Sequence, residues 1–152
     1  MKNIYLIRHG KATHNYDFQL RGAEAYSDEI NADSGLVEEG FNQANNLSNN
    51  IEQFIKDNNI ELVITSPLRR CIMTSLIIFK NVNIPIIAND YVREYPPVRD
   101  VCNKRMSKEN LRWLFPKRID FSNLEEKDTL WSDDSANYQS IDKRIHLFKE
   151  FL

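Results

Sequence analysis

The stretch Ile4-Tyr5-Leu6-Ile7-Arg8-His9-Gly10 is an apolar run that ends abruptly in a cation, an imidazole and a glycine. A run this short and this apolar is typical of a β-strand buried on both faces of a sheet. In open α/β sheets, ligands bind just beyond the carboxyl ends of the strands. The stretch therefore predicts a buried strand at Ile4–Ile7 and a functional site directly after it.

Outward from this stretch, apolar runs alternate with helices of three- and four-residue apolar spacing, which is the pattern of an α/β fold with a mostly parallel sheet. The expected strands are 4–7, 62–64 and 84–87; the expected helices are 36–58, 68–77, 107–114 and 138–152, with a polar loop and a short helix in 11–35. Asp33 or Ser34 is expected to cap the helix that begins near Leu36. No repeat or linker divides the chain, so we expect one domain over residues 1–152.

The composition excludes several classes of partner. The net charge of −2 implies no general attraction to nucleic acid or to an anionic membrane, so any basic site must be local. No apolar stretch is long enough for a signal peptide core or a transmembrane helix, and we expect a soluble cytoplasmic protein. Two cysteines, Cys71 and Cys102, make no disulfide framework and are expected to be free thiols.

Basic residues follow two of the expected strands, in Arg8-His9-Gly10 and in Ser66-Pro67-Leu68-Arg69-Arg70. In a parallel sheet both groups lie at the same edge, where guanidinium forks and helix N–H groups bind phosphate oxygens. Nearby arginines disfavour the protonated form of His9 and leave a lone pair for attack. For either group alone a solvated strand end is the favoured explanation; the two together favour nucleophilic catalysis on phosphorus.

These residues resemble the histidine phosphatase superfamily, also called phosphoglycerate mutase-like. The resemblance rests on an ordered set of motifs that spans the chain: Arg8-His9-Gly10 with Asn15, Asp33-x-Gly35-Leu36 with Gly40 and Gln43-Ala44, Ser66-Pro67-Leu68-Arg69-Arg70 with Thr74, Arg93-Glu94, Cys102-Asn103-Lys104-Arg105, Leu114-Phe115-Pro116, Ile119-Asp120-Phe121 and Leu130-Trp131. It implies a three-layer α/β/α domain with a phosphoglycerate mutase-like topology.

The resemblance also implies roles for individual residues. His9 would be the nucleophile that becomes phosphohistidine, and Glu94 would be the general acid that protonates the leaving oxygen, with a pKa raised by partial burial. No metal or organic cofactor is implied. The residues expected to contact the phosphoryl group or the rest of the substrate are Arg8, Asn15, Arg70, Lys104 and Arg105. Without the resemblance, Glu94 is better explained as an ordinary surface carboxylate, and Lys104 and Arg105 are explained equally well as a solvated pair.

One departure from the family pattern concerns a second histidine, which family members carry on a strand that follows the last helix. This sequence ends at Leu152, so the expected fold is C-terminally shortened. His146 fits a helix surface, and His14 is the residue that could replace the missing histidine. Without the last strand, Ile4–Ile7 would leave a sheet edge exposed, which favours self-association.

The leading hypothesis is a phosphatase that hydrolyses a small phosphomonoester through phosphohistidine, with activity that is weak or lost if the second histidine is absent. Two alternatives stay open. One is a non-catalytic module that binds phosphate or a phosphoprotein, and the other is a phosphoglycerate mutase. The absence of the longer insertions by which glycolytic mutases hold a bisphosphate primer favours hydrolysis over mutase chemistry.

Overall fold

A computed structural model describes residues 3–95, 100–132 and 140–152. At its centre lie two parallel strands, β1 (Val63–Thr65) and β2 (Ile86–Ala88), with Val63 paired to Ile86. The crossover between them contains helix α5 (Arg69–Ile78). This β–α–β unit confirms the α/β class and the parallel sheet, although β1 and β2 each lie one or two residues beyond the expected start.

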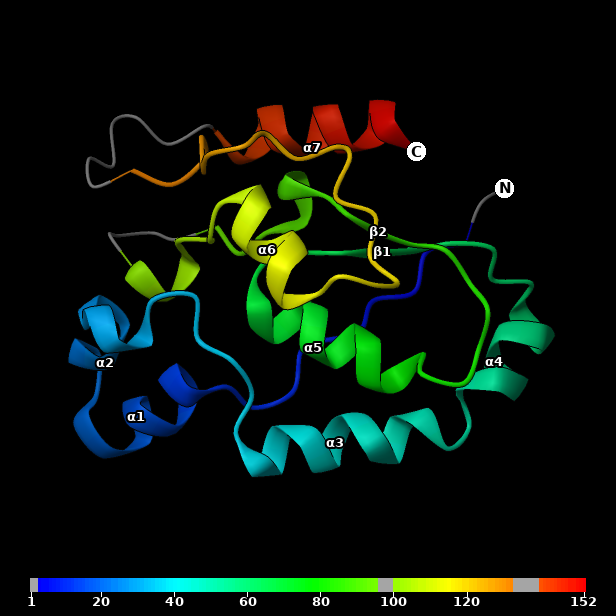
Figure 1. Cartoon of the computed structure of the whole chain (residues 1–152), viewed down its shortest axis with the longest axis horizontal. Helices are drawn as coiled ribbons and strands as arrows, with labels where there is room; N and C mark the ends of the chain where they lie inside the picture. Colours follow the sequence, from blue (N-terminus) through cyan, green and yellow to red (C-terminus); the bar gives the residue numbers. More distant parts are fainter. Residues whose placement is uncertain (1–2, 96–99, 133–139) are drawn as a thin grey trace.

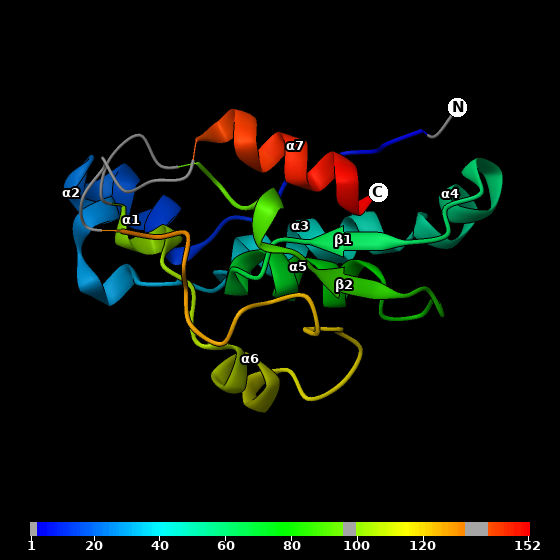
Figure 2. The same cartoon turned by 90° about the horizontal axis from the view of Figure 1, so that it is seen from above.

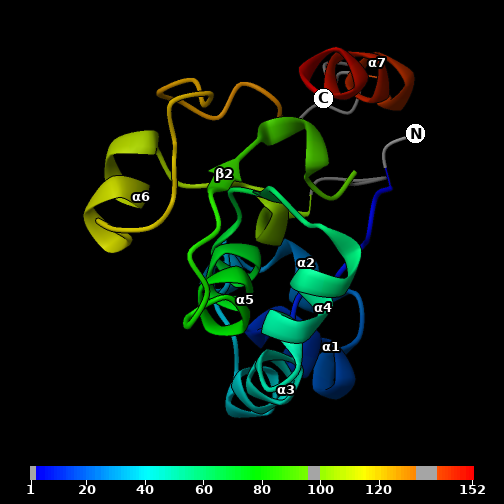
Figure 3. The same ribbon diagram turned by 90° about the vertical axis from the view of Figure 1, so that its right-hand side faces the viewer.

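Helices cover both faces of this small sheet, as Figures 1 and 3 show. Helices α5 and α3 (Glu38–Ser48) lie on one side, and α7 (Ile141–Phe151) lies on the other. Figure 2 shows β1 and β2 side by side. The arrangement agrees with the expected α/β/α layers.

The remaining elements are short and connect these layers. They are α1 (Thr13–Arg21), α2 (Glu24–Ser27), η1 (Glu29–Asn31), α4 (Ile51–Asn58), η2 (Asp90–Val92), η3 (Val101–Asn103) and α6 (Lys108–Leu114). The expected helix at 107–114 is confirmed as α6, whose N-cap Ser107 accepts a hydrogen bond from the Asn110 N–H.

The single helix expected over 36–58 is two helices, α3 and α4. Asn50 has φ −115° and ψ 3°, which is outside helical geometry, and it separates them. Both helices contribute to one core cluster, through Ala44 of α3 and Ile51 of α4, together with Ile78 and Ile86. Because both helices pack on the same core, the apolar spacing continues across a break that the periodicity alone does not reveal.

The expectation of a buried strand at Ile4–Ile7 is wrong in this structure. The segment forms no ladder with β1, and Leu6 is 93% exposed. Its anchor is helix α4 instead: the Tyr5 ring packs edge-on against Phe54 at 5.0 Å, and the Tyr5 hydroxyl donates to Oδ1 of Asn58 at 2.7 Å. Figure 3 shows this N-terminal segment in blue, running down the side of the molecule away from β2.

Helix α7 forms where expected, with Ser140 as its N-cap, but it does not bury the expected face. Ile141, Ile145 and Leu152 are each at least 40% exposed. Arg144 is buried instead, and its guanidinium donates to backbone carbonyl groups of η2 and the residues after it. A polar contact with the backbone therefore holds α7 on the sheet. No helix among the described residues is long and apolar enough to cross a membrane.

Candidate active site

The centre of the candidate site is the contact between the loop after the N-terminal segment and helix α5. Nε of Arg70 lies 3.2 Å from Nε2 of His9. One residue further on, the Gly10 N–H donates to Oγ1 of Thr74 at 3.0 Å, and the Thr74 hydroxyl donates to the carbonyl oxygen of Arg70 at 2.7 Å. Two side chains one turn apart on α5 thus fasten His9 and Gly10, which brings together the two basic groups singled out in the sequence.

The hydrogen bonds of His9 define its tautomer. Nδ1 lies 2.7 Å from the carbonyl oxygen of Gly10, which can only accept, so Nδ1 carries the proton. Nε2 therefore carries the lone pair that accepts from Arg70. Burial lowers the pKa of His9; the hydrogen bond to Gly10 and the charge of Glu94 oppose this, while the charges of Arg70 and Arg8 lower the pKa further. His9 is therefore neutral at pH 7, with the lone pair on the nitrogen that faces a fixed cation.

Arg70 is only 1% exposed, and each of its three nitrogens has a partner. Besides the bond to His9, Nη1 donates to the carbonyl oxygen of Cys102 at 2.8 Å, and Nη2 donates to Oδ1 of Asn103 at 2.7 Å. The guanidinium has five N–H groups, and these three bonds leave one on each Nη for a further acceptor. The cation is rigidly held and keeps donors for an anion.

Glycine is required where α3 packs against the loop that carries His9, Gly10 and Lys11. A Cβ on Gly40 would lie 2.1 Å from the carbonyl oxygen of Lys11, and a Cβ on Gly10 would lie 2.5 Å from the carbonyl oxygen of Gly40. Both clashes involve backbone, which cannot rotate away. The close approach of α3 leaves the backbone after His9 little freedom.

His14 lies beside His9, with ring centroids 6.1 Å apart. It is buried, its Nδ1 lies 2.6 Å from Oγ of Ser34, and its Nε2 accepts from the amide of Asn15 at 3.0 Å. Burial, chiefly, and the nearby positive charge lower the pKa of His14 to about 3. Both nitrogens are engaged and the ring is neutral, so this geometry does not support His14 as a replacement for a phosphate-binding histidine.

Asn15 serves two local bonds in this structure. Its Oδ1 accepts from the Ala12 N–H at 3.0 Å, at the start of α1, while its amide group holds His14. Both polar groups of the Asn15 side chain thus have partners within the protein, and its predicted contact with phosphate stays a prediction.

The expectation that Asp33 or Ser34 caps the helix near Leu36 is wrong. The N-cap of α3 is Val37, without a side-chain cap bond. The Asp33 carboxylate instead accepts from the N–H of Arg69 at 2.8 Å, at the start of α5, and from the N–H of Met106 at 3.1 Å. Burial raises the pKa of Asp33. This side chain ties the start of the arginine-bearing helix to a loop 73 residues away in sequence.

Arg8 and Glu94 lie within electrostatic range of His9 but form no side-chain contact with it. Both residues are exposed. The partial burial expected for Glu94 is therefore not found. Arg144 of α7 donates to the backbone oxygens of Arg93 and, at 3.5 Å, Glu94. Helix α7 thus fixes the main chain that carries the predicted general acid and leaves its carboxylate in solvent.

The two residues predicted to face the substrate after Asn103 lie in different surroundings. Lys104 is exposed, with Nζ 4.4 Å from the centroid of the Trp131 ring. Arg105 is buried, and its nitrogens donate to the Asp90 carboxylate and to backbone oxygens of Met106, Glu125 and Lys127. Arg105, unlike Arg70, is paired with a carboxylate, and its predicted substrate contact stays a prediction.

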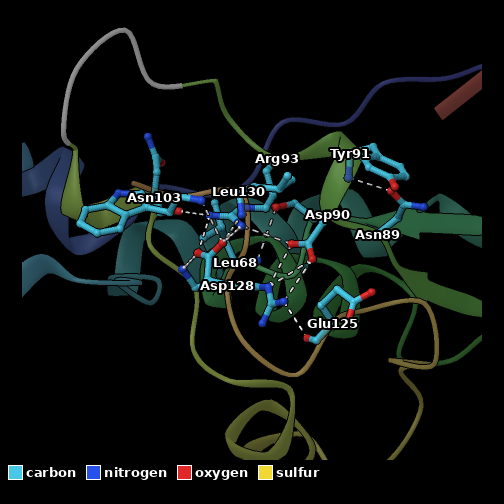
Figure 4. A network of polar contacts seen from close by, with 12 residues as sticks. Leu68, Asn89, Asp90, Tyr91, Arg93, Asn103, Glu125, Asp128 and Leu130 are labelled. Atoms are coloured by element: carbon cyan, nitrogen blue, oxygen red, sulfur yellow. Dashed lines mark hydrogen bonds and ion pairs between the residues drawn. The ribbon is translucent and has the colours of Figure 1, made fainter. Parts of the chain in front are cut away.

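A buried ion network stands behind the site, and Figure 4 shows Asp90, Arg93 and Asp128 pointing toward one another. Nη1 and Nη2 of Arg93 lie 2.6 and 2.8 Å from the two oxygens of Asp128, and Nη1 lies 3.2 Å from Asp90. Burial raises the pKa of Asp128, but the hydrogen bonds and charge of Arg93 outweigh it, so the pKa lies below its ordinary value. Burial lowers the pKa of Arg93, but the same contacts outweigh it and raise that pKa, so Arg93 and Asp128 form a charged pair at pH 7.

Sequence reasoning missed the groups that connect this network to Arg70. The Asn103 backbone oxygen accepts from Arg93, while its side chain accepts from Arg70. Asn103 was noticed only as part of a motif, and nothing in the sequence marks the carbonyl oxygen of Cys102. Among the described residues no group of three or more His, Cys, Asp and Glu side chains could hold a metal ion, and Cys71 and Cys102 are free thiols.

Comparison with known proteins identifies the family. The model of the histidine phosphatase superfamily (branch 1) matches residues 4–96. The chain belongs to the histidine phosphatase superfamily. This result confirms the resemblance that the motifs carried.

Relatives of this histidine phosphatase superfamily member include Phosphoglycerate mutase-like protein 1 of Arabidopsis thaliana, 30% identical over 180 aligned residues that cover 99% of this chain and 62% of the relative. A second Arabidopsis thaliana protein, Phosphoglycerate mutase-like protein, is 29% identical and covers 86% of this chain and 58% of its own length. The chain thus spans about three-fifths of the length of these curated relatives.

A solved structure has the same fold. It is the crystal structure of a presumed alpha-ribazole-5′-P phosphatase from Escherichia coli K-12, with a TM-score of 0.55 and 20% identity. The match covers 95% of this chain and 64% of that chain. It confirms the phosphoglycerate mutase-like α/β fold of this superfamily member.

Proposed function

We propose that the protein hydrolyses a small phosphomonoester through a phosphohistidine formed on Nε2 of His9. The observation that carries the proposal is the fixed tautomer of His9: Nδ1–H donates to Gly10, and the lone pair of Nε2 faces the guanidinium of Arg70. A neutral imidazole beside a fixed cation is what attack on an anionic phosphoryl group requires. Membership of the superfamily and the fold of the E. coli neighbour, named as a phosphatase, support the same reaction class.

The reaction would proceed in two balanced steps. Nε2 forms a bond to phosphorus as the bond to the leaving oxygen breaks, and Glu94 gives that oxygen its proton. A water molecule then attacks phosphorus, Glu94 takes the proton of the water, and the lone pair returns to Nε2 as inorganic phosphate leaves. The Nη hydrogens of Arg70 that are not used within the protein, together with Arg8, would bind the phosphoryl oxygens in both steps.

A second candidate function is a phosphate-binding module without turnover. One observation favours it: in this structure Arg70 donates to the same Nε2 lone pair that must attack, so an anion has to displace that hydrogen bond first. Because the Arabidopsis relatives are named phosphoglycerate mutase-like, the experiment also tests for transfer of a phosphoryl group between positions of phosphoglycerate.

Trapping of the phosphoenzyme tests these possibilities. The protein is mixed with p-nitrophenyl phosphate, quenched in base, in which phosphohistidine is stable, and mapped by mass spectrometry. Modification of His9 with release of inorganic phosphate, both absent in His9→Ala, is the expected result. Binding of phosphate without modification would favour the module, and transfer between positions of phosphoglycerate without release of phosphate would favour the mutase. A chain that neither binds phosphate nor becomes modified would overturn the proposal.

The leaving group tests the role of Glu94. p-Nitrophenolate leaves readily without a proton, whereas the alkoxide of glycerol 2-phosphate does not. Because Glu94 would also serve as the base of the second step, the rate of His9 phosphorylation is measured in a single turnover. Glu94→Gln is expected to slow phosphorylation by glycerol 2-phosphate by about 10²- to 10⁴-fold and that by p-nitrophenyl phosphate much less. An equal loss in the two phosphorylation rates would remove Glu94 from the acid role.

A further inference from the structure

The buried arginines of this molecule differ in the charge of their partners. Arg93 and Arg105 both contact carboxylates, those of Asp90 and Asp128. Arg70 and Arg144 are also buried, yet in the described ranges neither makes an ion pair. Arg144 donates to backbone oxygens. The partners of Arg70 are an imidazole nitrogen, a backbone carbonyl and the Asn103 amide oxygen, so it is the one of the two that lies against His9. A buried charge is costly unless it is compensated. Arg70 therefore keeps a positive charge that the protein orients without neutralising.

Asn103 is suited to this task because it is itself held from behind. It is 3% exposed and ends η3, and its backbone oxygen accepts from Nη2 of Arg93. The Asp128 carboxylate accepts a hydrogen bond from Arg93. It also accepts from the N–H of Arg105 at 2.9 Å, two residues beyond Asn103. The ion network thus fixes the main chain directly after the Asn103 side chain, while the Asn103 N–H donates to the carbonyl oxygen of Asp100 at 3.0 Å on the other side.

We propose that Asn103 is a positioning residue, which aims the Arg70 guanidinium at Nε2 of His9 through a neutral acceptor and so keeps the charge of Arg70 available to a bound anion. The part that concerns the anion rests on the proposed function. The part that concerns alignment and charge rests on the contacts alone and is measurable without ligand.

The proposal has a specific electrostatic consequence for His9. The charged groups that act on its ring are Arg70, Arg8 and Glu94, and the neighbouring ring of His14 is neutral. Asn103→Asp keeps the shape and the acceptor but places a carboxylate against Arg70. This variant is expected to raise the pKa of His9, because the cation that opposes protonation becomes paired. The variant is also expected to bind inorganic phosphate about tenfold more weakly. A tenfold change in affinity corresponds to the same free energy as a shift of one pKa unit.

The test is an NMR titration of the imidazole signals, which is practicable because the chain has three histidines. Asn103→Asp is compared with Asn110→Asp, which adds the same charge at an exposed position of α6. Binding of inorganic phosphate is measured by calorimetry on the same samples. The expected result is a raised His9 pKa and weakened phosphate binding in Asn103→Asp, with wild-type values in Asn110→Asp.

Unchanged values in Asn103→Asp, or equal changes in the two variants, would overturn the proposal. If Asn103→Asp does not fold, Asn103→Ala removes the acceptor without adding charge; it is expected to weaken phosphate binding about tenfold, and wild-type affinity would overturn the proposal. If the wild-type protein itself binds no phosphate, the proposed function fails, and the titration of His9 still decides whether Asn103 sets the charge that acts on it.

Discussion

The residues behind His9 and the residues before it form two contrasting regions. Behind it, charged side chains lie buried, and the guanidinium nitrogens of Arg70 and Arg105 all have partners. Before it, the apolar segment Ile4–Ile7 is exposed and paired with no strand. The contrast teaches that polarity does not determine burial here. The charged network finds all its partners within the described chain, whereas an apolar strand needs a neighbouring surface on each face.

The apolar region includes an open groove of about 820 Å³. Its lining residues come from the N-terminal segment, α4, β1, α5 and α7, and among them are Ile4, Leu6, Ile64, Phe148 and Leu152. The exposed edge of β1 faces this region, so the groove is where the small sheet stops. Stability is thus expected to reside in the polar region and in the clusters around α5, and the following predictions test that division.

The largest effect is expected from Asp128→Ala. The substitution leaves Arg93 buried with a single remaining carboxylate partner, Asp90, and removes the acceptor of the Arg105 N–H. Loss of one partner from a buried ion pair costs about 3–5 kcal/mol of unfolding free energy. Urea denaturation followed by circular dichroism measures this. Asp57→Ala, on the exposed face of α4, is the matched control and is expected to change stability by less than about 0.5 kcal/mol.

A smaller loss is expected from Gly40→Ala. The added methyl group would lie against the carbonyl oxygen of Lys11, so α3 must shift away from the loop that carries His9 and Lys11. Overpacking of this kind costs about 1–3 kcal/mol. Thermal unfolding gives the loss in stability, and the NMR shift of His9 reports the displaced loop. Gly22→Ala is a poor control because Gly22 has φ +71°; Ser27→Ala, at an exposed position of α2, is the better one.

The pH dependence of stability should carry the signature of Asp128. Folding lowers the pKa of this carboxyl, so the unfolded chain binds more protons near pH 4. The stabilisation is complete above the ordinary aspartate pKa of about 3.9 and is lost as the pH falls through the lower folded-state value. Urea midpoints measured between pH 3 and pH 7 should therefore rise with pH, and less steeply in Asp128→Asn. An identical slope in both proteins would contradict the assignment.

The smallest effect is expected in the apolar region, from Leu6→Ser. A side chain that is 93% exposed loses little on truncation, so unfolding free energy should change by less than about 0.5 kcal/mol. A loss of about 2–5 kcal/mol would mean that the segment is packed in solution. Sedimentation velocity then separates the two ways of packing it: a smaller particle in Leu6→Ser indicates that a second copy covers the segment, and an unchanged one indicates burial within the chain.

The sequence predicts the parts of this molecule that local patterns encode. Strand β2 and helix α5 follow from apolar spacing. The two basic groups do meet, although one of the two expected strands that led to this prediction, Ile4–Ile7, does not form. The break at Asn50 was missed because packing on a shared core preserves the spacing. Ile4–Ile7 was misplaced because an apolar run reports the need for burial and says nothing of whether a neighbour is present.

The supporting contacts of the site were beyond prediction for a different reason. Arg93 and Asp128 are 35 residues apart, and Asp128 lies in an irregular segment without periodicity. The acceptors for Arg70 include a backbone oxygen, which every residue possesses. The burial of Arg105 and its pairing with Asp90 were equally beyond prediction, because charge alone does not reveal which partners a side chain has inside the fold.

Because Arg70 and Thr74 both lie on α5, this helix sets the distance between the side chain that contacts His9 and the side chain that holds Gly10. Four residues of α-helix advance about 6 Å and return to nearly the same side. Helix geometry thus fixes the position of the Arg70 guanidinium relative to Gly10, and a helix is stiffer than a loop. The separation of the His9 imidazole from the Arg70 guanidinium therefore depends on the spacing of two side chains along one helix. A single residue inserted between Arg70 and Thr74 would turn the Thr74 hydroxyl by about 100° around the helix axis and remove its hydrogen bond to Gly10.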